Sequence, residues 1–317
     1  MQAIADSVNE EFPHVRISTL ADNGALQPPA QLKFRPNVIV QLCTQTMNEF
    51  LPLSHPQNKP SLELIRAWAK AVPTLYIWDY INNYHNTLLP FPNYFTQATH
   101  IREMQSLGAD GYLGQGTTNA GVEMIDLKTY VASRTAFDPS LSTDDLVVEF
   151  TDGFYSSTAA PHVRAYMGIM AAAFNSSSQI MGAGFNLNVD SVASLNHSLL
   201  AAASALVAAK QVAEPGESYQ LRLSEALLNI QWVVLQRWDR LQAVATAEQL
   251  PWPFATTLAE EFGRFAAALT YAFRRSNQAP HFLEQFIQGT RRIKKDCDLR
   301  CFAQQLGLNA SSLLDAR

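Results

Sequence analysis

The stretch that most constrains this chain runs from Pro73 to Asn93, where an apolar run changes abruptly into a polar and aromatic one. Residues 75–78 are hydrophobic, rich in β-forming types and placed just after a proline, which predicts a short buried strand. The polar cluster follows the carboxyl end of this strand. In α/β folds, and in barrels above all, ligands bind at that end. The candidate site residues here are Trp78, Asp79, Tyr80, Asn82, Asn83, Tyr84 and His85.

Three further strands are expected in the first part of the chain, separated by helices and long loops. The expected strands cover residues 14–20, 37–43 and 110–116, and the expected helices cover 2–11, 61–72, 96–107 and 122–136. This succession predicts an α/β fold with parallel strands joined by right-handed crossovers. The last of these strands contributes Gln115 to the candidate site, because it too ends at the carboxyl edge.

After Pro139 the sequence changes character, and it shows no evident strand. Helical periodicity and capping residues predict helices over 142–155, 161–174, 191–213, 217–248, 258–274 and 281–292. We therefore divide the chain into an α/β part, residues 1–138, and an α-helical part, residues 139–317.

Composition and charge exclude several classes of function. Only 16% of the residues are charged, which fits extensive internal packing or a surface that meets another chain. The net charge of −5 gives no reason to expect nucleic acid or an anionic membrane as a partner. Apolar runs fall short of the roughly 20 residues that span a membrane, and the N-terminus lacks a secretion-signal pattern. A cytoplasmic location is the default expectation.

No cofactor or metal site is expected from the motifs. The chain has three cysteines, Cys43, Cys297 and Cys301, a number and spacing that form no disulfide framework. Cys297 and Cys301 lie one helical turn apart, but no second pair completes a metal site. The glycines around 111–121 lack the dinucleotide-binding spacing, and no nucleophile-elbow motif is present.

Several segments of the chain resemble the bacterial family known as domain of unknown function 4838. They are FPHVRISTLAD, PPAQLKFRPNVIVQLCTQ, LYIWDYINNYHNTLLPFPN, GYLGQG and FDPSLSTDDLVVEFTDGFYSSTA. The segment with WDY and PFPN is the most specific, and the likeness continues more weakly to residues 222–234. The resemblance implies a glycoside-hydrolase-like protein with a (β/α)8 barrel, in the neighbourhood of the hexosaminidases and α-glucuronidases, that takes a carbohydrate ligand.

The chain departs from a complete barrel of that kind. By resemblance, the strands at Ile17 and Val40 look like the fifth and sixth, and those at Trp78 and Gln115 like the seventh and eighth. We therefore expect the C-terminal half of a (β/α)8 TIM-like barrel, with about four parallel strands, followed by an all-α region. Relatives often take the general acid from the fourth strand, so it is expected to be absent. Position 22, where an aromatic is expected, holds Asp22.

Half of a barrel leaves two unpaired edges and an exposed inner face. Something must cover them: a partner chain, such as an upstream barrel half, a second copy of the chain, or the helical part. The resemblance therefore predicts self-association or poor solubility.

Hydrolysis of a glycosidic bond usually needs two carboxyl groups facing the scissile bond, about 5 Å apart for retention and about 6.5–9.5 Å for inversion. Asp79 is the best-placed candidate, and Glu123 is a second. Each has a structural alternative: Asp79 can bond the backbone of the next turn, and Glu123 can cap a helix. Asp22 and Glu49 are explained most simply as a turn residue and a solvated loop residue.

The remaining candidates suit sugar binding. Trp78, Tyr80 and Tyr84 can stack on sugar rings or belong to the core, and Asn82, Asn83, His85 and Gln115 can bond hydroxyl groups. The leading hypothesis is a glycoside-hydrolase-like protein that acts on or binds a glycan. A non-catalytic glycan-binding or scaffold protein, and an inactive remnant, remain alternatives.

Overall fold

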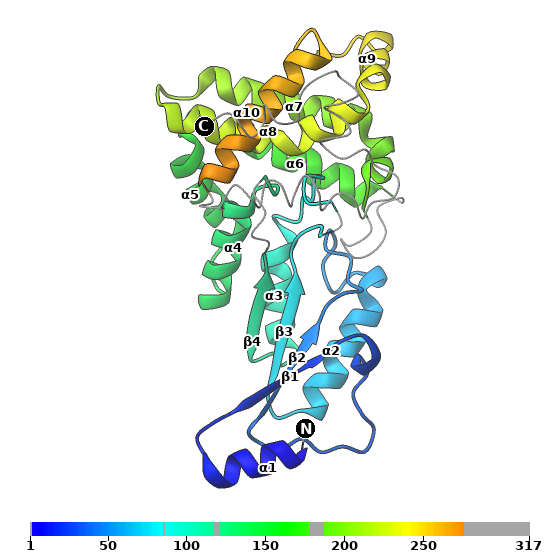
Figure 1. Cartoon of the computed structure of the whole chain (residues 1–317), viewed down its shortest axis with the longest axis vertical. Coiled ribbons are helices and arrows are strands. Elements are labelled where there is room, and N and C mark those ends of the chain that lie inside the picture. Colours follow the sequence, from blue (N-terminus) through cyan, green and yellow to red (C-terminus); the bar gives the residue numbers. More distant parts are fainter. Residues whose placement is uncertain (1, 85, 117–120, 178–186, 276–317) are drawn as a thin grey trace. The chain divides into compact units, whose positions relative to one another are not determined.

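The computed structural model describes residues 2–84, 86–116, 121–177 and 187–275 (Figure 1). The chain divides into two units. Unit 1 comprises residues 1–81, 93–116 and 128–143, and unit 2 comprises 82–92, 117–127 and 144–317. The longest segment of unit 2 begins at residue 144. The segments that follow the third and fourth strands, however, group with the helices of unit 2.

Unit 1 contains an open parallel sheet in the order β1-β2-β3-β4. The strands are β1 (Ile17–Ala21), β2 (Val38–Cys43), β3 (Leu75–Tyr80) and β4 (Gly111–Gln115). Each pairs in parallel with the next along the chain. The other elements are α1 (Gln2–Glu11), η1 (Asn23–Ala25), η2 (Pro56–Asn58), α2 (Lys59–Ala71), α3 (Thr96–Ser106) and most of α4 (Ile125–Phe137). The prediction of an α/β fold with four parallel strands is confirmed, and the open sheet is consistent with a partial barrel.

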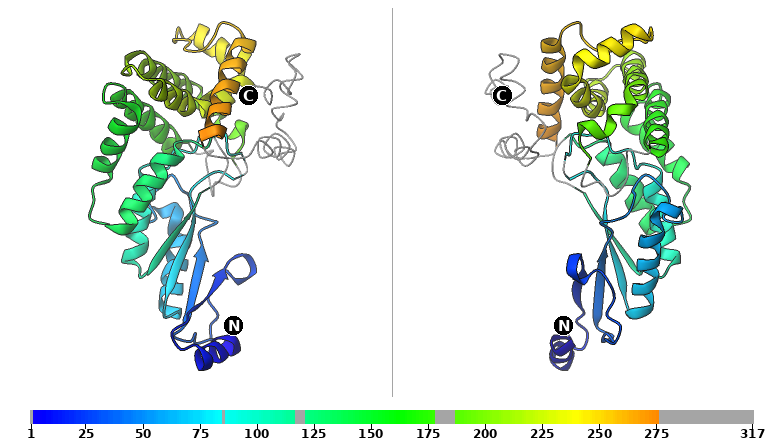
Figure 2. Two further views of the ribbon diagram at one scale, coloured as in Figure 1. Left: turned by 60° about the vertical axis from the view of Figure 1, so that its left-hand side comes forward. Right: turned by 90° about the vertical axis from the view of Figure 1, so that its right-hand side faces the viewer.

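The core of unit 1 lies on one face of this sheet, against α2 and α3 (Figure 2). Alternate residues of the strands, such as Val40, Leu42 and Ile77, are buried there with Trp68 of α2. We call this the packed face. The residues between them form the open face, on which Leu20 is 49% exposed and Leu113 is 40% exposed. A sheet with one packed and one open face is what half of a barrel wall presents.

From residue 143 onwards, the described residues form helices and no strand, as predicted. These helices are α5 (Thr143–Tyr155), α6 (Ala160–Ser176), η3 (Val189–Leu195), α7 (Asn196–Val212), α8 (Glu217–Gln236), α9 (Trp238–Ala247) and α10 (Leu258–Arg275). Helix α8 is central: every residue from 226 to 235 is buried, and α8 packs against both α7 and α10.

Two helix predictions need comment. The single helix expected over 217–248 is wrong, because the backbone of Arg237 (φ −129°, ψ 25°) leaves the helical region and separates α8 from α9. The break turns Trp238 and Leu241 into the core. The helix predicted over 281–292, like Cys297 and Cys301, lies outside the described residues.

One helix is longer and more apolar than the sequence analysis allowed. Residues Val189–Val212, which join η3 and α7, form 24 residues that by length and composition alone could cross a membrane. Leu199, Leu200 and Leu206 of this segment are buried, and α7 packs against α6 and α8. These contacts are those of a core helix.

The two segments that unit 2 takes from between the strands are held by α8. The Asn229 carboxamide donates to the carbonyl oxygens of Leu88 (3.2 Å) and Gly121 (3.0 Å). Gly121 has a φ of +77°, and a Cβ there would lie 3.1 Å from side-chain atoms of Leu88 and Leu269. The positive φ favours glycine, and a side chain at this position would also be tightly packed.

The two-faced sheet predicts a contrast between matched substitutions. We expect Leu42→Ala, on the packed face, to lower the free energy of unfolding of unit 1 by about 2–5 kcal/mol, because it opens a cavity. Leu20→Ala removes the same atoms from the open face and should change it by about 0.5 kcal/mol or less. Urea unfolding measures both. A comparable loss in Leu20→Ala would mean that the open face is covered in solution, for example by a second copy.

Candidate functional site

The alternation of β3 separates the residues that the sequence analysis grouped together. Trp78 and Tyr80 are half-buried on the open face, whereas Asp79 is fully buried on the packed face. Successive side chains of a strand point to opposite faces. The Trp-Asp-Tyr triplet therefore contributes to two different places, an aromatic row and a buried polar cluster.

The aromatic row consists of Tyr76, Trp78 and Tyr80, which follow one another along the open face. The Trp78 indole N–H donates to the Gln115 carboxamide oxygen on β4. The ring of Tyr76 lies against Gly111, where an added Cβ would come within 2.7 Å of ring atoms. The structure thus brings Trp78, Tyr80 and Gln115 together, as expected. Tyr76 was missed, although the alternation of the strand points to it.

The residue that directly follows β1 is Asp22, which carries a carboxylate. Asp22 accepts from the Asn23 backbone N–H (2.8 Å), which caps η1, and also from the Gln45 carboxamide. Gln45 also forms a hydrogen bond with Tyr80, so Gln45 links Asp22 to the aromatic row. Burial is the main cause that raises the pKa of Tyr80, and the charge of Asp22 adds to it. Asp22 is the turn residue that the sequence predicted, and it also supplies a partly exposed carboxylate beside the row.

The buried polar cluster surrounds Asp79 on the packed face. Thr44 Oγ1 donates to Asp79 Oδ1 (2.6 Å) and Tyr112 Oη donates to Asp79 Oδ2 (2.8 Å). Glu49 and His100 complete the group, with Nδ1 of His100 lying 3.6 Å from Oε2 of Glu49. Glu49 is therefore not the solvated loop residue that the sequence analysis favoured, because it is buried.

The charges of this cluster are strongly coupled. Burial and the nearby charge of Asp79 raise the pKa of Glu49 to about 8, against the opposing effects of His100 and Lys128. Burial by itself lowers the pKa of His100, but the adjacent Glu49 and the charge of Asp79 outweigh it and raise the pKa to about 9. The imidazole thus favours its charged form beside the two carboxyl groups.

Glu49, Asp79 and His100 could hold a metal by geometry alone, since one potential ligand atom of each lies within 4.8 Å of the others. The charges around these three residues favour a structural ion network over a metal site. The Lys128 ammonium is fully buried near Glu49, and Nε2 of His100 lies 2.7 Å from the Leu51 carbonyl oxygen. With cations already facing the carboxylates, the cluster fits a buried ion network that fastens α3 and the long loop to the sheet.

Glu123, the second predicted acid, belongs to unit 2 and is buried there. Its carboxylate accepts from the Phe91 backbone N–H (2.5 Å) and from the Tyr166 hydroxyl. The residue precedes α4 by two positions and ties two chain segments to α6. Its contacts are those of a structural acceptor.

The remaining predicted residues also lie in unit 2. The Asn83 carboxamide donates to the Leu187 carbonyl oxygen (3.1 Å) and accepts from the Asn86 backbone N–H (3.3 Å). Asn82 is buried, and its carboxamide makes no hydrogen bond to any described residue. Tyr84 is half-buried, and His85 lies outside the described residues.

Comparison with protein families gives one match. The model of the family described as Domain of unknown function (DUF4838) matches residues 1–168. The chain belongs to this family. The match spans unit 1 and the first helices of the helical region. No curated protein and no solved structure matches the chain.

The buried polar cluster predicts how stability depends on pH. The folded-state pKa values of Glu49 and His100 are both raised, from 4.5 to about 8 and from 6.5 to about 9. The native chain therefore binds more protons than the unfolded chain between about pH 4.5 and 9, and stability should fall as pH rises through that window. For each extra proton that the native chain binds, the free energy of unfolding falls by at most about 1.4 kcal/mol per pH unit.

Glu49→Gln should flatten this slope, because it removes one titrating group and the main partner that raises the pKa of His100. The measurement is urea unfolding from pH 5 to 9. Glu63→Gln, an exposed position on α2, is the matched control and should keep the wild-type slope. Parallel slopes in wild type and Glu49→Gln would contradict the assignment.

Proposed function

We propose that unit 1 binds a glycan on the open face of its sheet. The aromatic row supplies rings on which sugar faces stack, and the groups around it supply polar contacts. The observation that carries the proposal is that Tyr76, Trp78 and Tyr80 form a continuous aromatic strip on the less buried side of β3. Binding sites commonly combine apolar and aromatic walls with a few placed polar groups.

The polar groups beside the strip suit sugar hydroxyls. The Gln115 and Gln45 carboxamides offer donors and acceptors, and Asp22 offers a partly exposed carboxylate. All of them lie at or beyond the carboxyl ends of parallel strands, which is the ligand-binding edge of such sheets. The proposal therefore agrees with the glycoside-hydrolase-like character that the family resemblance implies.

Binding without cleavage is the function that the geometry supports best. Hydrolysis needs a second carboxyl group beside the sugar. Asp79 faces the opposite side of the sheet with Thr44 and Tyr112 as donors, and Glu123 is buried with its own partners. Among the described carboxyl groups of unit 1, Asp22 is the one that adjoins the aromatic row; the others lie on helices, in the turn after α4 (Asp138), just before β4 (Asp110) or in the buried polar cluster.

Loss of the central ring should weaken binding. We expect Trp78→Ala to weaken affinity for hexosamine- and glucuronate-containing oligosaccharides by about tenfold or more, since aromatic stacking contributes about 0.5–1.5 kcal/mol in addition to the buried apolar area. Isothermal titration calorimetry measures this. Phe137→Ala removes an aromatic that is 91% exposed at the end of α4 and should leave affinity unchanged. Equal losses of affinity in Trp78→Ala and Phe137→Ala would indicate non-specific hydrophobic binding instead.

Aryl glycosides of hexosamine and glucuronic acid separate binding from hydrolysis. We expect them to bind without release of the aryl group. Asp22→Asn should weaken binding severalfold, whereas Asp79→Asn should lower the melting temperature and leave the affinity of the folded protein intact. Turnover that disappears in Asp79→Asn would instead assign this residue to catalysis and contradict the proposal.

A further inference from the structure

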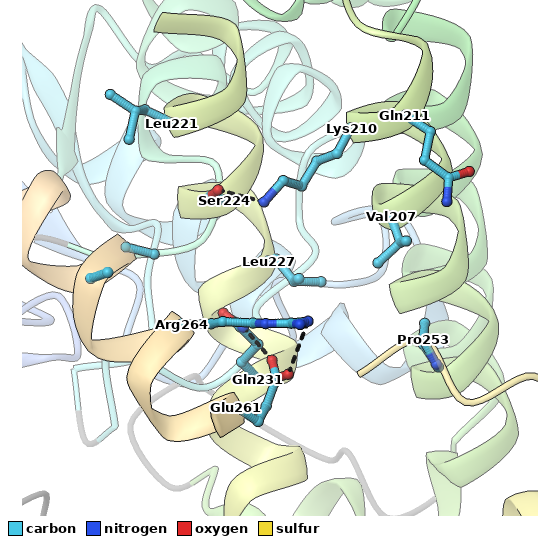
Figure 3. Close-up of a pocket in the computed structure, with 12 residues that line it drawn as sticks. Val207, Lys210, Gln211, Leu221, Ser224, Leu227, Gln231, Pro253, Glu261 and Arg264 are labelled. Atoms are coloured by element: carbon cyan, nitrogen blue, oxygen red, sulfur yellow. Dashed lines mark hydrogen bonds and ion pairs between the residues drawn. The ribbon is translucent and has the colours of Figure 1, made fainter. Parts of the chain in front are cut away.

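Unit 2 contains a cavity of about 440 Å³ between α7, α8 and α10 (Figure 3). Its walls are largely apolar, with Val207, Leu221 and Leu227 among them. This volume lies in the range of small-molecule pockets, which bury an apolar body and fix it with a few polar groups. The residues that line the cavity all belong to unit 2, and none of them belongs to the aromatic row.

Two cationic side chains line this cavity. The Lys210 ammonium donates to Ser224 Oγ (2.7 Å), which leaves two further N–H donors. The Arg264 side chain is 64% exposed. It forms an ion pair with Glu261 at 3.8 Å, a distance beyond hydrogen-bond length. Figure 3 shows the Lys210 and Arg264 side chains reaching in from α7 and α10. Both retain donors for an incoming anion.

The carboxylate of Glu261 is already engaged. Its Oε1 accepts from the Gln231 carboxamide N–H, and its Oε2 accepts from the Ala255 backbone N–H (2.8 Å). A carboxylate only accepts, so the Gln231 amide must present nitrogen to it. This fixes the orientation of Gln231, whose buried Oε1 accepts no hydrogen bond from any described residue. An unsatisfied buried acceptor is costly and calls for a donor.

We propose that this cavity binds a small organic acid: a carboxylate held by Lys210 and Arg264, an apolar body against the aliphatic walls, and a hydroxyl group that donates to Gln231 Oε1. Each part of this ligand is complementary to one set of groups that line the cavity. Arg264 presents a planar set of donors that matches a carboxylate, and charge-assisted hydrogen bonds of this kind are the stronger class.

The electrostatics of the empty cavity agree with an anionic ligand. Burial and the charge of Arg264 lower the pKa of Lys210, and Glu261 opposes this only in part. A carboxylate placed between the two cations would stabilise both of them.

Calorimetric titration of the full chain with 3-hydroxydecanoate, decanoate and 1-decanol tests the proposal. We expect affinity to fall in that order, because decanoate lacks the hydroxyl group and decanol lacks the charge. Arg264→Met and Lys210→Met should each weaken 3-hydroxydecanoate binding by about tenfold or more and leave decanol binding unchanged. Arg264 is exposed, and Glu261 keeps its two other donors, so Arg264→Met should fold normally.

Arg240→Met is the matched control, since Arg240 is exposed on α9 and does not line the cavity. It should bind all three probes as wild type does. Failure of wild type to prefer the carboxylates over decanol, or undiminished binding in both Arg264→Met and Lys210→Met, would overturn the site. Equal affinities for decanoate and 3-hydroxydecanoate would remove the assigned role of Gln231.

Discussion

Burial of the Asp79 carboxylate on the packed face is the constraint on which unit 1 depends. A buried charge is tolerated only with hydrogen-bonding and charged partners. Thr44 and Tyr112 supply the hydrogen bonds, and His100 adds charge from α3. Once Asp79 is fixed inward, the period of the strand turns Trp78 and Tyr80 outward. One side of β3 then carries the buried polar cluster, and the other carries the aromatic row.

Unit 2 also contains buried carboxylates that are held by hydrogen bonds. Glu123 and Glu261 are both buried, and both accept from a backbone N–H and from a side chain. Each joins segments that are distant in sequence. By holding the Gln231 amide in one orientation, Glu261 also determines which polar atom remains unsatisfied in the cavity. Glu261 itself lines that cavity, so the same carboxylate joins chain segments and orients a neighbouring polar group.

The candidate site was predictable in part. Trp78, Tyr80 and Gln115 were found because aromatic and amide residues at strand ends are a local pattern. Tyr76 was missed because it lies four residues before the carboxyl end of β3, and only the alternation along the face of the strand points to it. His100 and Lys128 carry no local signal, since only the packing of α3 and α4 in unit 1 brings them towards Asp79 and Glu49.

The sequence by itself determined the α/β class, the four parallel strands, the helical second part and membership of a family, because periodicity, capping and family motifs are local properties. Tertiary structure decided which side of the sheet is packed, and hence that Asp79 is buried while Asp22 adjoins the open face. It also decided that residues 82–92 and 117–127 group with the helices, through hydrogen bonds such as those of Asn229. Such choices depend on contacts between residues far apart in the chain, which no local pattern encodes.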